Sequence, residues 1–164
     1  MTSIFEEQML ALLPKLRRLA RSLARDAADA DDLCQQAVER ALKARAQWQE
    51  GTRLDAWMYR IMRNLWIDEA RARTRRAITF VPEEDGVNVG DDGETAAENH
   101  VAAGEIDRAM FSLPDEQREV IALVLVEGLA YREAADILDI PIGTLTSRLV
   151  RGRQALLRKL EAAA

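Results

Sequence analysis

Apolar residues recur at helical spacing in two long blocks of this chain, and the stretch between the blocks lacks any such period. In the first block, the leucines of Leu12–Leu23 and the apolar residues of Leu54–Leu65 repeat every three or four positions, which predicts amphipathic α-helices. The intervening stretch, Ala77–Gly104, contains Pro82 and four glycines. We therefore expect an all-α protein of two small helical domains, residues 1–76 and 105–164, joined by a flexible acidic linker over residues 77–104.

Signals for helix ends divide each half into shorter helices. In the first half, Asp26 or Asp29 can cap a second helix, and Gly51 separates it from the helix that begins near Leu54. In the second half, Ser112 as a cap, Pro114 in the first turn and Gly128 at the end predict another helix.

The remainder of the second half has the outline of a helix-turn-helix. A short helix, a tight connection and a longer helix that starts near Thr144 follow one another. This motif needs a small residue where the helices cross, a residue that tolerates positive φ in the turn, and an apolar residue that fills the core. These positions would be Ala135, Asp139 and Leu145. Asp is among the better residues other than Gly for a left-handed turn.

Composition excludes several classes of protein. At 164 residues, with 48% hydrophobic and 31% charged residues, the chain can form a packed core without disulfides or metals. One cysteine, Cys34, and one histidine cannot form an internal disulfide or a four-ligand zinc site, and no catalytic constellation appears. We expect no enzyme activity, no cofactor and no metal. Acids near the start and the lack of a long apolar run predict a cytoplasmic protein that does not insert into a membrane.

The net charge of −5 hides a strong segregation of charge. Nine acids and no Lys or Arg lie in Ala77–Asp107, and the rest of the chain carries 23 basic and 19 acidic residues. Arg53–Arg76 holds seven arginines against three acids, and Ile140–Leu160 holds five basic residues and no acid. Two basic helical segments therefore flank an acidic connector, which favours binding to nucleic acid.

The two basic segments suit different forms of nucleic acid. The second helix of the helix-turn-helix would place its N-terminal residues near base edges in the major groove: Thr144, Thr146, Ser147 and Arg148. Arg151 and Arg153 would contact phosphates. The first segment combines arginines with Trp57 and Tyr59, as binders of single strands do, and Asn64 can accept and donate hydrogen bonds at a base edge. For the second helix of the helix-turn-helix, the alternative is a basic face that is only exposed to solvent. For the first basic segment, the alternative is that the aromatic rings pack in the core.

Two motifs in this chain resemble those of the extracytoplasmic-function (ECF) sigma factors, the promoter-recognition subunits of bacterial RNA polymerase. The first half reads "DADDLCQQAVERAL" and "LDAWMYRIMRNLWID", and the second half reads "LPDEQREVIALVLVEGLAYREAADILDIPIGTLTSRLVRGR". The resemblance covers nearly everything outside the predicted linker. It implies a factor that binds core polymerase, recognises the minus-thirty-five and minus-ten promoter elements, and assists melting to initiate transcription.

The resemblance also implies a role for each region. Docking on core polymerase, at the clamp helices of its largest subunit, would involve Asp31, Asp32, Gln35 and Gln36, and the flap is a further expected contact. The loop before the third helix and that helix would capture a flipped base and hold the unpaired strand of the minus-ten element. The residues expected there are Gln49, Glu50, Gly51, Thr52, Arg53, Trp57, Tyr59, Arg60, Arg63, Asn64, Arg71, Arg73, Arg75 and Arg76. The helix-turn-helix would read the minus-thirty-five element.

Such factors are usually held inactive by an anti-sigma factor, often in a stress or envelope response, and that partner is expected here. Thr146 stands where many members have Lys, so the promoter sequence does not follow from the resemblance. In the docking helix, Gln36 replaces the usual Glu. Two alternatives remain. One is a sigma-like decoy that sequesters an anti-sigma factor, and the other is an ordinary dimeric helix-turn-helix regulator that reads palindromic sites.

Overall fold

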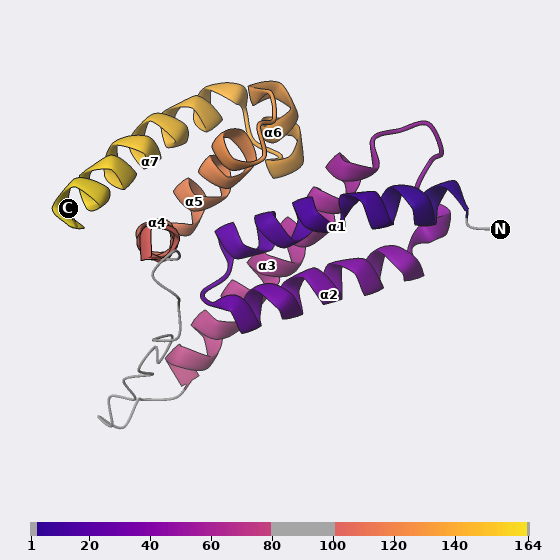
Figure 1. Ribbon diagram of the computed structural model, residues 1–164, viewed down its shortest axis with the longest axis horizontal. Coiled ribbons are helices and arrows are strands. Elements are labelled where there is room, and N and C mark those ends of the chain that lie inside the picture. Colours follow the sequence, from indigo (N-terminus) through magenta and orange to yellow (C-terminus); the bar gives the residue numbers. More distant parts are fainter. Residues whose placement is uncertain (1–2, 80–100, 164) are drawn as a thin grey trace.

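The computed structural model describes residues 3–79 and 101–163 (Figure 1). The helices are α1 (Ile4–Leu23), α2 (Ala27–Lys43), α3 (Leu54–Thr79), α4 (Val101–Phe111), α5 (Asp115–Ile121), α6 (Tyr131–Leu138) and α7 (Ile142–Ala163). A short 3₁₀ turn, η1 (Arg45–Gln47), follows α2, and a π-helical stretch, η3 (Ala122–Val126), continues α5. No strand occurs in the described ranges, and the predicted all-α class is confirmed.

Local capping fixes the starts of the first two helices. Ser3 and Glu6 form a capping box at α1, in which each side chain accepts a hydrogen bond from the backbone of the other. The Asp26 carboxylate caps α2 by accepting from the backbone N–H of Asp29 at 2.8 Å, which selects Asp26 from the two predicted caps. Pro14 lies inside α1.

Helices extend into both ends of the predicted linker, residues 77–104. Helix α3 continues to Thr79 and α4 begins at Val101, so both ends of the stretch assigned to the linker are helical. Residues 80–100 of that stretch lie outside the described residues.

The start of α5 also differs from the prediction. The Ser112 hydroxyl does not cap α5; it donates to the backbone oxygen of Ala109 at 2.7 Å and so satisfies a carbonyl at the end of α4. The N-cap of α5 is Pro114, one residue before the first helical turn. The predicted end at Gly128 is supported by its positive φ of 71°.

The two halves pack against each other. Figure 1 shows α1, α2 and α3 side by side, with α4–α7 grouped along one side of them. Helix α1 contacts α4, α5 and η3, and α3 contacts α6. Buried apolar side chains of both halves belong to one continuous cluster, with Leu16 and Met62 from the first half and Ile121 and Leu145 from the second. Within the described ranges, no helix has the length and apolar content needed to cross a membrane.

Candidate nucleic-acid interface

Helix α3 keeps most of its aromatic rings inside the protein. Tyr59 is 1% exposed and Trp66 is buried, because both continue the apolar stripe that packs on the rest of the fold. Trp57 is half-buried, and its ring lies edge-on to Phe5 with 6.3 Å between centroids. Trp57 and Tyr59, both predicted to meet unpaired bases, therefore do not form an open stacking platform in this arrangement, whereas Asn64 is exposed.

Three arginines predicted to contact the minus-ten element face the second half of the chain. Arg53 contacts the Glu133 carboxylate at 2.5 Å as well as Asp55, two residues along the chain, at 2.8 Å. Arg60 Nη2 donates to the backbone oxygen of Asp136 at 2.9 Å. Arg63 Nε donates to the Glu119 carboxylate at 3.1 Å. At these positions the guanidinium groups are thus paired with groups of α5 and α6, while Arg53 and Arg60 stay exposed and Arg63 is half-buried.

The arginines nearer the end of α3 lie away from that contact. Arg73 bridges Asp29 of α2 at 3.2 Å and Glu69 of its own helix at 3.4 Å, and Arg76 also reaches Glu69, at 3.2 Å. The other two predicted contacts in this part of the helix, Arg71 and Arg75, have exposed side chains. The C-terminal part of α3 therefore presents cations at the surface.

The loop predicted to capture a base is a tight turn. Gln49, Glu50, Gly51 and Thr52 are all exposed. The backbone N–H and the hydroxyl of Thr52 both donate to the backbone oxygen of Gln49, at 3.1 and 2.6 Å. Gly51 has φ of +91°, a conformation that side-chain-bearing residues rarely adopt. The turn holds the two ends of the loop close together.

An aromatic cluster packs the residues on either side of this loop together. The Phe5 ring lies 5.5 Å from the ring of Trp48, which precedes the loop, and it also contacts Trp57, which follows it. The guanidinium of Arg45 lies 5.1 Å from the Phe5 centroid and donates to the Ser3 hydroxyl at 2.5 Å. Phe5, in the first turn of α1, therefore links both ends of the loop.

The second half contains the predicted helix-turn-helix. Asp139 between α6 and α7 has φ 54° and ψ 48°, as the left-handed turn requires. Ala135 and Leu145 are both buried where the motif needs a small crossing residue and an apolar plug. The backbone N–H of Ile140 donates to the oxygen of Ala135 at 3.1 Å and closes the turn.

The N-terminal half of α7 forms the exposed edge of this motif. Thr146, Ser147, Arg151 and Arg153 are exposed, while Thr144 and Arg148 are half-buried. The Thr146 hydroxyl donates to the backbone oxygen of Ile142 at 2.9 Å, and Arg148 lies 3.6 Å from the Glu116 carboxylate of α5. Four of the six predicted minus-thirty-five residues thus share an accessible surface.

The predicted polymerase-docking residues lie on α2. Asp31, Asp32, Gln35 and Gln36 are all exposed. Asp31 and Gln35 border an open groove between α1 and α2 that also touches Cys34. Burial raises the pKa of the Cys34 thiol, which favours the protonated and less reactive form.

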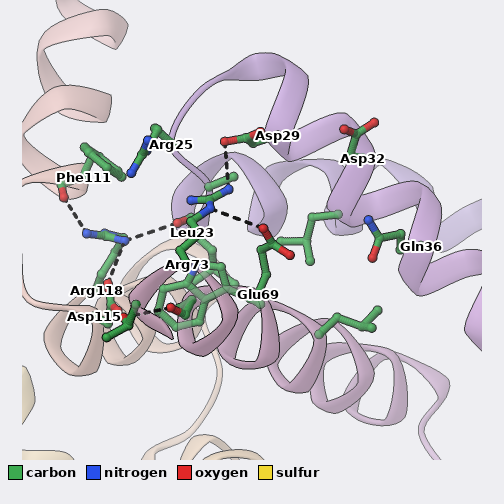
Figure 2. A pocket seen from close by; sticks show the side chains of 16 residues that line it. Leu23, Arg25, Asp29, Asp32, Gln36, Glu69, Arg73, Phe111, Asp115 and Arg118 are labelled. Carbon is green, nitrogen blue, oxygen red and sulfur yellow. Dashed lines mark hydrogen bonds and ion pairs between the residues drawn. The ribbon is translucent and has the colours of Figure 1, made fainter. Parts of the chain in front are cut away.

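Asp32 and Gln36 border a pocket of about 330 Å³ between the two halves (Figure 2). The pocket is lined by α2, α3 and the α4–α5 region, and Phe111 and Arg118 form its wall on the side of the second half. Figure 2 shows Asp32 and Gln36 near each other on α2 without a dashed contact, whereas dashed contacts join Arg73 to Asp29 and Glu69 and, separately, Arg118 to Asp115 and to backbone oxygens. Part of the predicted docking surface therefore lies next to the junction of the halves.

Three charged residues that join the halves were not among the residues predicted from the sequence. Arg118 and Glu119 are 4% and 3% exposed, and the Glu127 side chain is fully buried. Arg118 donates to backbone oxygens at the end of α4, in the α4–α5 connection and at Leu23 of α1. The only sequence signal is position, since these charges flank the apolar run Val120–Val126.

Burial changes the acid–base behaviour at this junction. Burial raises the pKa of the Glu119 carboxyl, and the nearby Arg63 guanidinium offsets this only in part. Burial and the adjacent Glu127 carboxylate likewise raise the pKa of Tyr59, so the phenol stays protonated and donates to Glu127 at 3.2 Å. The junction thus depends on a neutral Tyr59 hydroxyl and on acid–arginine contacts.

The chain matches the model of Sigma-70 region 2 over residues 9–76 and that of Sigma-70, region 4 over residues 103–156. Its relatives include the ECF RNA polymerase sigma factor EcfG of Rhodopseudomonas palustris (strain TIE-1), which is 36% identical over 160 residues that cover 95% of this chain and 84% of the relative. The ECF RNA polymerase sigma factor SigW of Bacillus subtilis (strain 168) is 30% identical over 160 residues, which cover 89% of this chain and 83% of SigW.

Solved structures show the same arrangement of helices. The sigma factor RpoE, crystallised in complex with the anti-sigma factor NepR from Bartonella quintana, superposes with a TM-score of 0.78 at 28% identity and 96% coverage of both chains. CnrH, solved in complex with the cytosolic domain of CnrY, gives a TM-score of 0.66 at 23% identity, covers 98% of this chain and 89% of CnrH, and shares the fold. With both region models matched in order and relatives aligned over most of their length, the chain belongs to the ECF RNA polymerase sigma factors.

Proposed function

We propose that this protein is a promoter-specificity subunit that docks on core RNA polymerase, contacts the minus-thirty-five and minus-ten elements, and assists melting of the promoter. In this proposal it acts as a cytoplasmic binding subunit and not as a catalyst. Residues 1–76 form the domain for docking and strand capture, and residues 105–164 form the domain for the minus-thirty-five element.

The observation that carries the proposal is the geometry of the helix-turn-helix in a member of this family. The left-handed turn at Asp139 directs α7 outward with Thr146, Ser147, Arg151 and Arg153 exposed. An exposed recognition helix that bears small polar residues at its start and cations further along can read base edges and hold phosphates.

Strand capture is assigned to α3 and the loop before it. Asn64 is exposed and offers both a donor and an acceptor, and Arg71 and Arg75 supply exposed cations. Melting needs no catalytic group, because a protein that binds the unpaired strand better than duplex shifts the opening equilibrium by that difference in affinity. Arg53, Arg60 and Arg63 also contact groups of the second half.

An anti-sigma factor is the further partner we propose. The support is that the related RpoE of Bartonella quintana was crystallised with the anti-sigma factor NepR and superposes over nearly the whole of this chain. The decoy alternative shares this partner but predicts no promoter-dependent transcript.

Run-off transcription tests the proposal. Purified core polymerase, the full chain and a promoter library should give specific transcripts that require the protein. Asn64→Ala should weaken them by about tenfold or more, since one bidentate base contact contributes roughly 1–3 kcal/mol. Gln8→Ala, which removes another exposed amide from α1, is the matched control and should have no effect. Failure to bind core polymerase would refute the proposal, and binding without any transcript would favour the decoy.

A further inference from the structure

Phe5, in the first turn of α1, packs beside the loop predicted to capture a base. We call this loop, residues 49–52, the capture loop. Its residues are all exposed, whereas the Phe5 side chain is only 3% exposed. The Phe5 ring lies 5.5 Å from the ring of Trp48, directly before the loop, and 6.3 Å from that of Trp57 in α3. One buried ring therefore contacts the chain on both sides of the capture loop.

Packing alone fixes the Trp48 side chain among the described residues. Its indole nitrogen Nε1 is buried and has no hydrogen-bond partner there. A buried indole N–H usually has an acceptor, which sets the direction of the ring. Without one, the orientation of Trp48 depends on its packing, and the Phe5 ring contacts it at an interplanar angle of 57°. Loss of the Phe5 ring should therefore loosen Trp48 and the residue that follows it, Gln49.

Arg45 joins the same turn of α1 to the segment that leads into the capture loop. Its guanidinium carbon lies 5.1 Å from the Phe5 centroid, and its Nη2 donates to the Ser3 hydroxyl at 2.5 Å. Its Nη1 lies 3.5 Å from the Glu6 carboxylate, and the capping box fixes both Ser3 and Glu6. The backbone N–H of Trp48 donates to the Arg45 oxygen at 3.1 Å. These five residues form one connected unit, which we call the loop anchor.

The capture loop has few contacts of its own. Its internal hydrogen bonds run from the backbone N–H and the hydroxyl of Thr52 to the oxygen of Gln49. At its tip, a Cβ added to Gly51 would meet no atom of the described residues within 4 Å. The internal bonds set the shape of the turn, but they do not tie it to α3. The position of the loop relative to Asn64, which is exposed on α3, therefore depends on the residues that flank the loop.

We propose that Phe5 is a positioning residue for strand capture: through Trp48 and Trp57 it fixes the capture loop relative to α3, and it thereby sets how well one base of the minus-ten element is distinguished from another. This inference rests on the proposed function, in which the loop and Asn64 bind the unpaired strand. A displacement of about 1 Å in the groups that line a binding site can remove most of its selectivity. Phe5 acts on this selectivity without contacting DNA, because its ring is buried.

Two variants of the full chain weaken the loop anchor by different routes. Phe5→Ala removes the ring, and Arg45→Gln removes the guanidinium at an exposed position that is not a proposed DNA contact. The control for the first is Leu16→Ala, which removes a fully buried side chain of α1 about 16 Å further along the helix. The control for the second is Arg40→Gln, which makes the same charge change at an exposed position of α2. Circular dichroism checks that each variant is folded at the assay temperature.

Hydrogen–deuterium exchange of the free chain, followed by mass spectrometry, is the first readout. The peptide that covers residues 48–54 should exchange about threefold to tenfold faster in Phe5→Ala and in Arg45→Gln, which is the effect of losing one aromatic or cation–π contact on a local opening equilibrium. Both controls should leave this peptide at the wild-type rate, because they remove no contact of the loop anchor. Unchanged exchange in both anchor variants would overturn the proposal, since the loop would then keep its position without the anchor.

Discrimination at the minus-ten element is the second readout. Run-off transcription with core polymerase compares one promoter from the library with derivatives that carry each single substitution in the minus-ten element. The ratio of transcript from the best to the poorest template should fall about tenfold in Phe5→Ala and less in Arg45→Gln, while the same ratio for the minus-thirty-five element stays constant. The controls should keep both ratios, even where Leu16→Ala gives less transcript overall.

The two readouts separate the role of Phe5 from the proposed function. An equal fall in both ratios, an equal fall in the controls, or an unchanged minus-ten ratio despite faster exchange would overturn the role of Phe5 in strand capture. If the wild type starts no transcript from any template, or does not discriminate at the minus-ten element, the proposed function fails and this role fails with it. The exchange rates then still show whether the anchor fixes the loop.

Discussion

Replacement of the buried Arg118 by methionine should cost more stability than any other single substitution considered for this chain. The guanidinium is 4% exposed and donates to the backbone oxygens of Met110 at 2.8 Å, of Leu113 at 2.7 Å and of Leu23 at 3.3 Å, as well as to that of Phe111. Met110 and Phe111 lie in the final turn of α4, and the Met110 oxygen also accepts from the backbone N–H of Leu113 at 3.1 Å. One side chain thus caps α4, fixes the α4–α5 connection and reaches α1.

The expected loss follows from two opposing terms. Each hydrogen bond from a charged donor contributes about 1.5–3 kcal/mol, and in the methionine variant the oxygens of Leu23, Phe111 and Leu113 would lose this donor, whereas the Met110 oxygen would keep the Leu113 N–H. Burial lowers the pKa of Arg118 despite the attraction of Asp115, so placing the cation here carries a desolvation cost that methionine avoids. The net loss should therefore lie well below the sum of the bonds, at about 3–5 kcal/mol, as for other buried charges whose partners are left behind.

Urea unfolding followed by circular dichroism measures this loss. Arg108→Met, at an exposed arginine of α4, is the control and should change the unfolding free energy by less than about 0.5 kcal/mol. Tryptophan fluorescence in a Trp48→Phe/Trp57→Phe background gives a local readout, because the remaining Trp66 ring centroid lies 5.9 Å from the Arg118 guanidinium carbon. A loss below about 1 kcal/mol for Arg118→Met would refute the reasoning, since the carbonyls would then have found other donors.

Three further substitutions test individual contacts by urea unfolding. Gly152→Ala should destabilise the protein by roughly 1–2 kcal/mol, because the new Cβ would lie 2.8 Å from Ile121 Cδ1. This overpacking outweighs the gain of about 1 kcal/mol in helix propensity. The loss should shrink in an Ile121→Val background. Asp139→Gly should stabilise by about 0.5–1 kcal/mol by relieving the left-handed turn, and a loss would show that the Asp side chain does more than tolerate it. Because the folded-state pKa of Glu119 is raised, the stability from its protonation is complete below the unfolded pKa and is lost as pH rises through the folded pKa. The unfolding free energy of the wild type, measured from pH 7 down to pH 4, should therefore contain a stabilising contribution from Glu119 protonation that grows as the pH falls. Glu119→Gln should lack this contribution.

The helix-turn-helix could be predicted from sequence because local rules determine it. The spacing of Ala135, Asp139 and Leu145 specifies a crossing, a left-handed turn and a plug within eleven residues, and the structure has all three. The predicted start of α5 was wrong, because the Ser112 hydroxyl donates to the preceding helix and the N-cap of α5 is Pro114. Local patterns determine which helices form, and competition between neighbours determines where they begin.

The contact between the halves could not be predicted, because no local pattern encodes it. Tyr59 has the spacing of a core residue and the chemistry of a base-stacking residue, and only the approach of Glu127, 68 positions later, determines which description applies. Arg63 looks like a phosphate contact until Glu119, 56 positions later, binds it. A charge in a sequence shows what a residue can bind, while the folded chain shows what it is binding.

The three candidate surfaces differ in accessibility, and this difference predicts the order in which they act. Asp31 and Gln35 on α2 and Arg151 and Arg153 on α7 are exposed, whereas Arg63 on α3 is held by the second half. A ligand shifts a closed–open equilibrium only by its differential affinity for the two states, so duplex DNA that contacts α7 alone should bind without opening the protein. Single-stranded DNA should bind weakly until core polymerase is added. Equal affinity of the free protein and of the polymerase complex for single-stranded DNA would contradict this order.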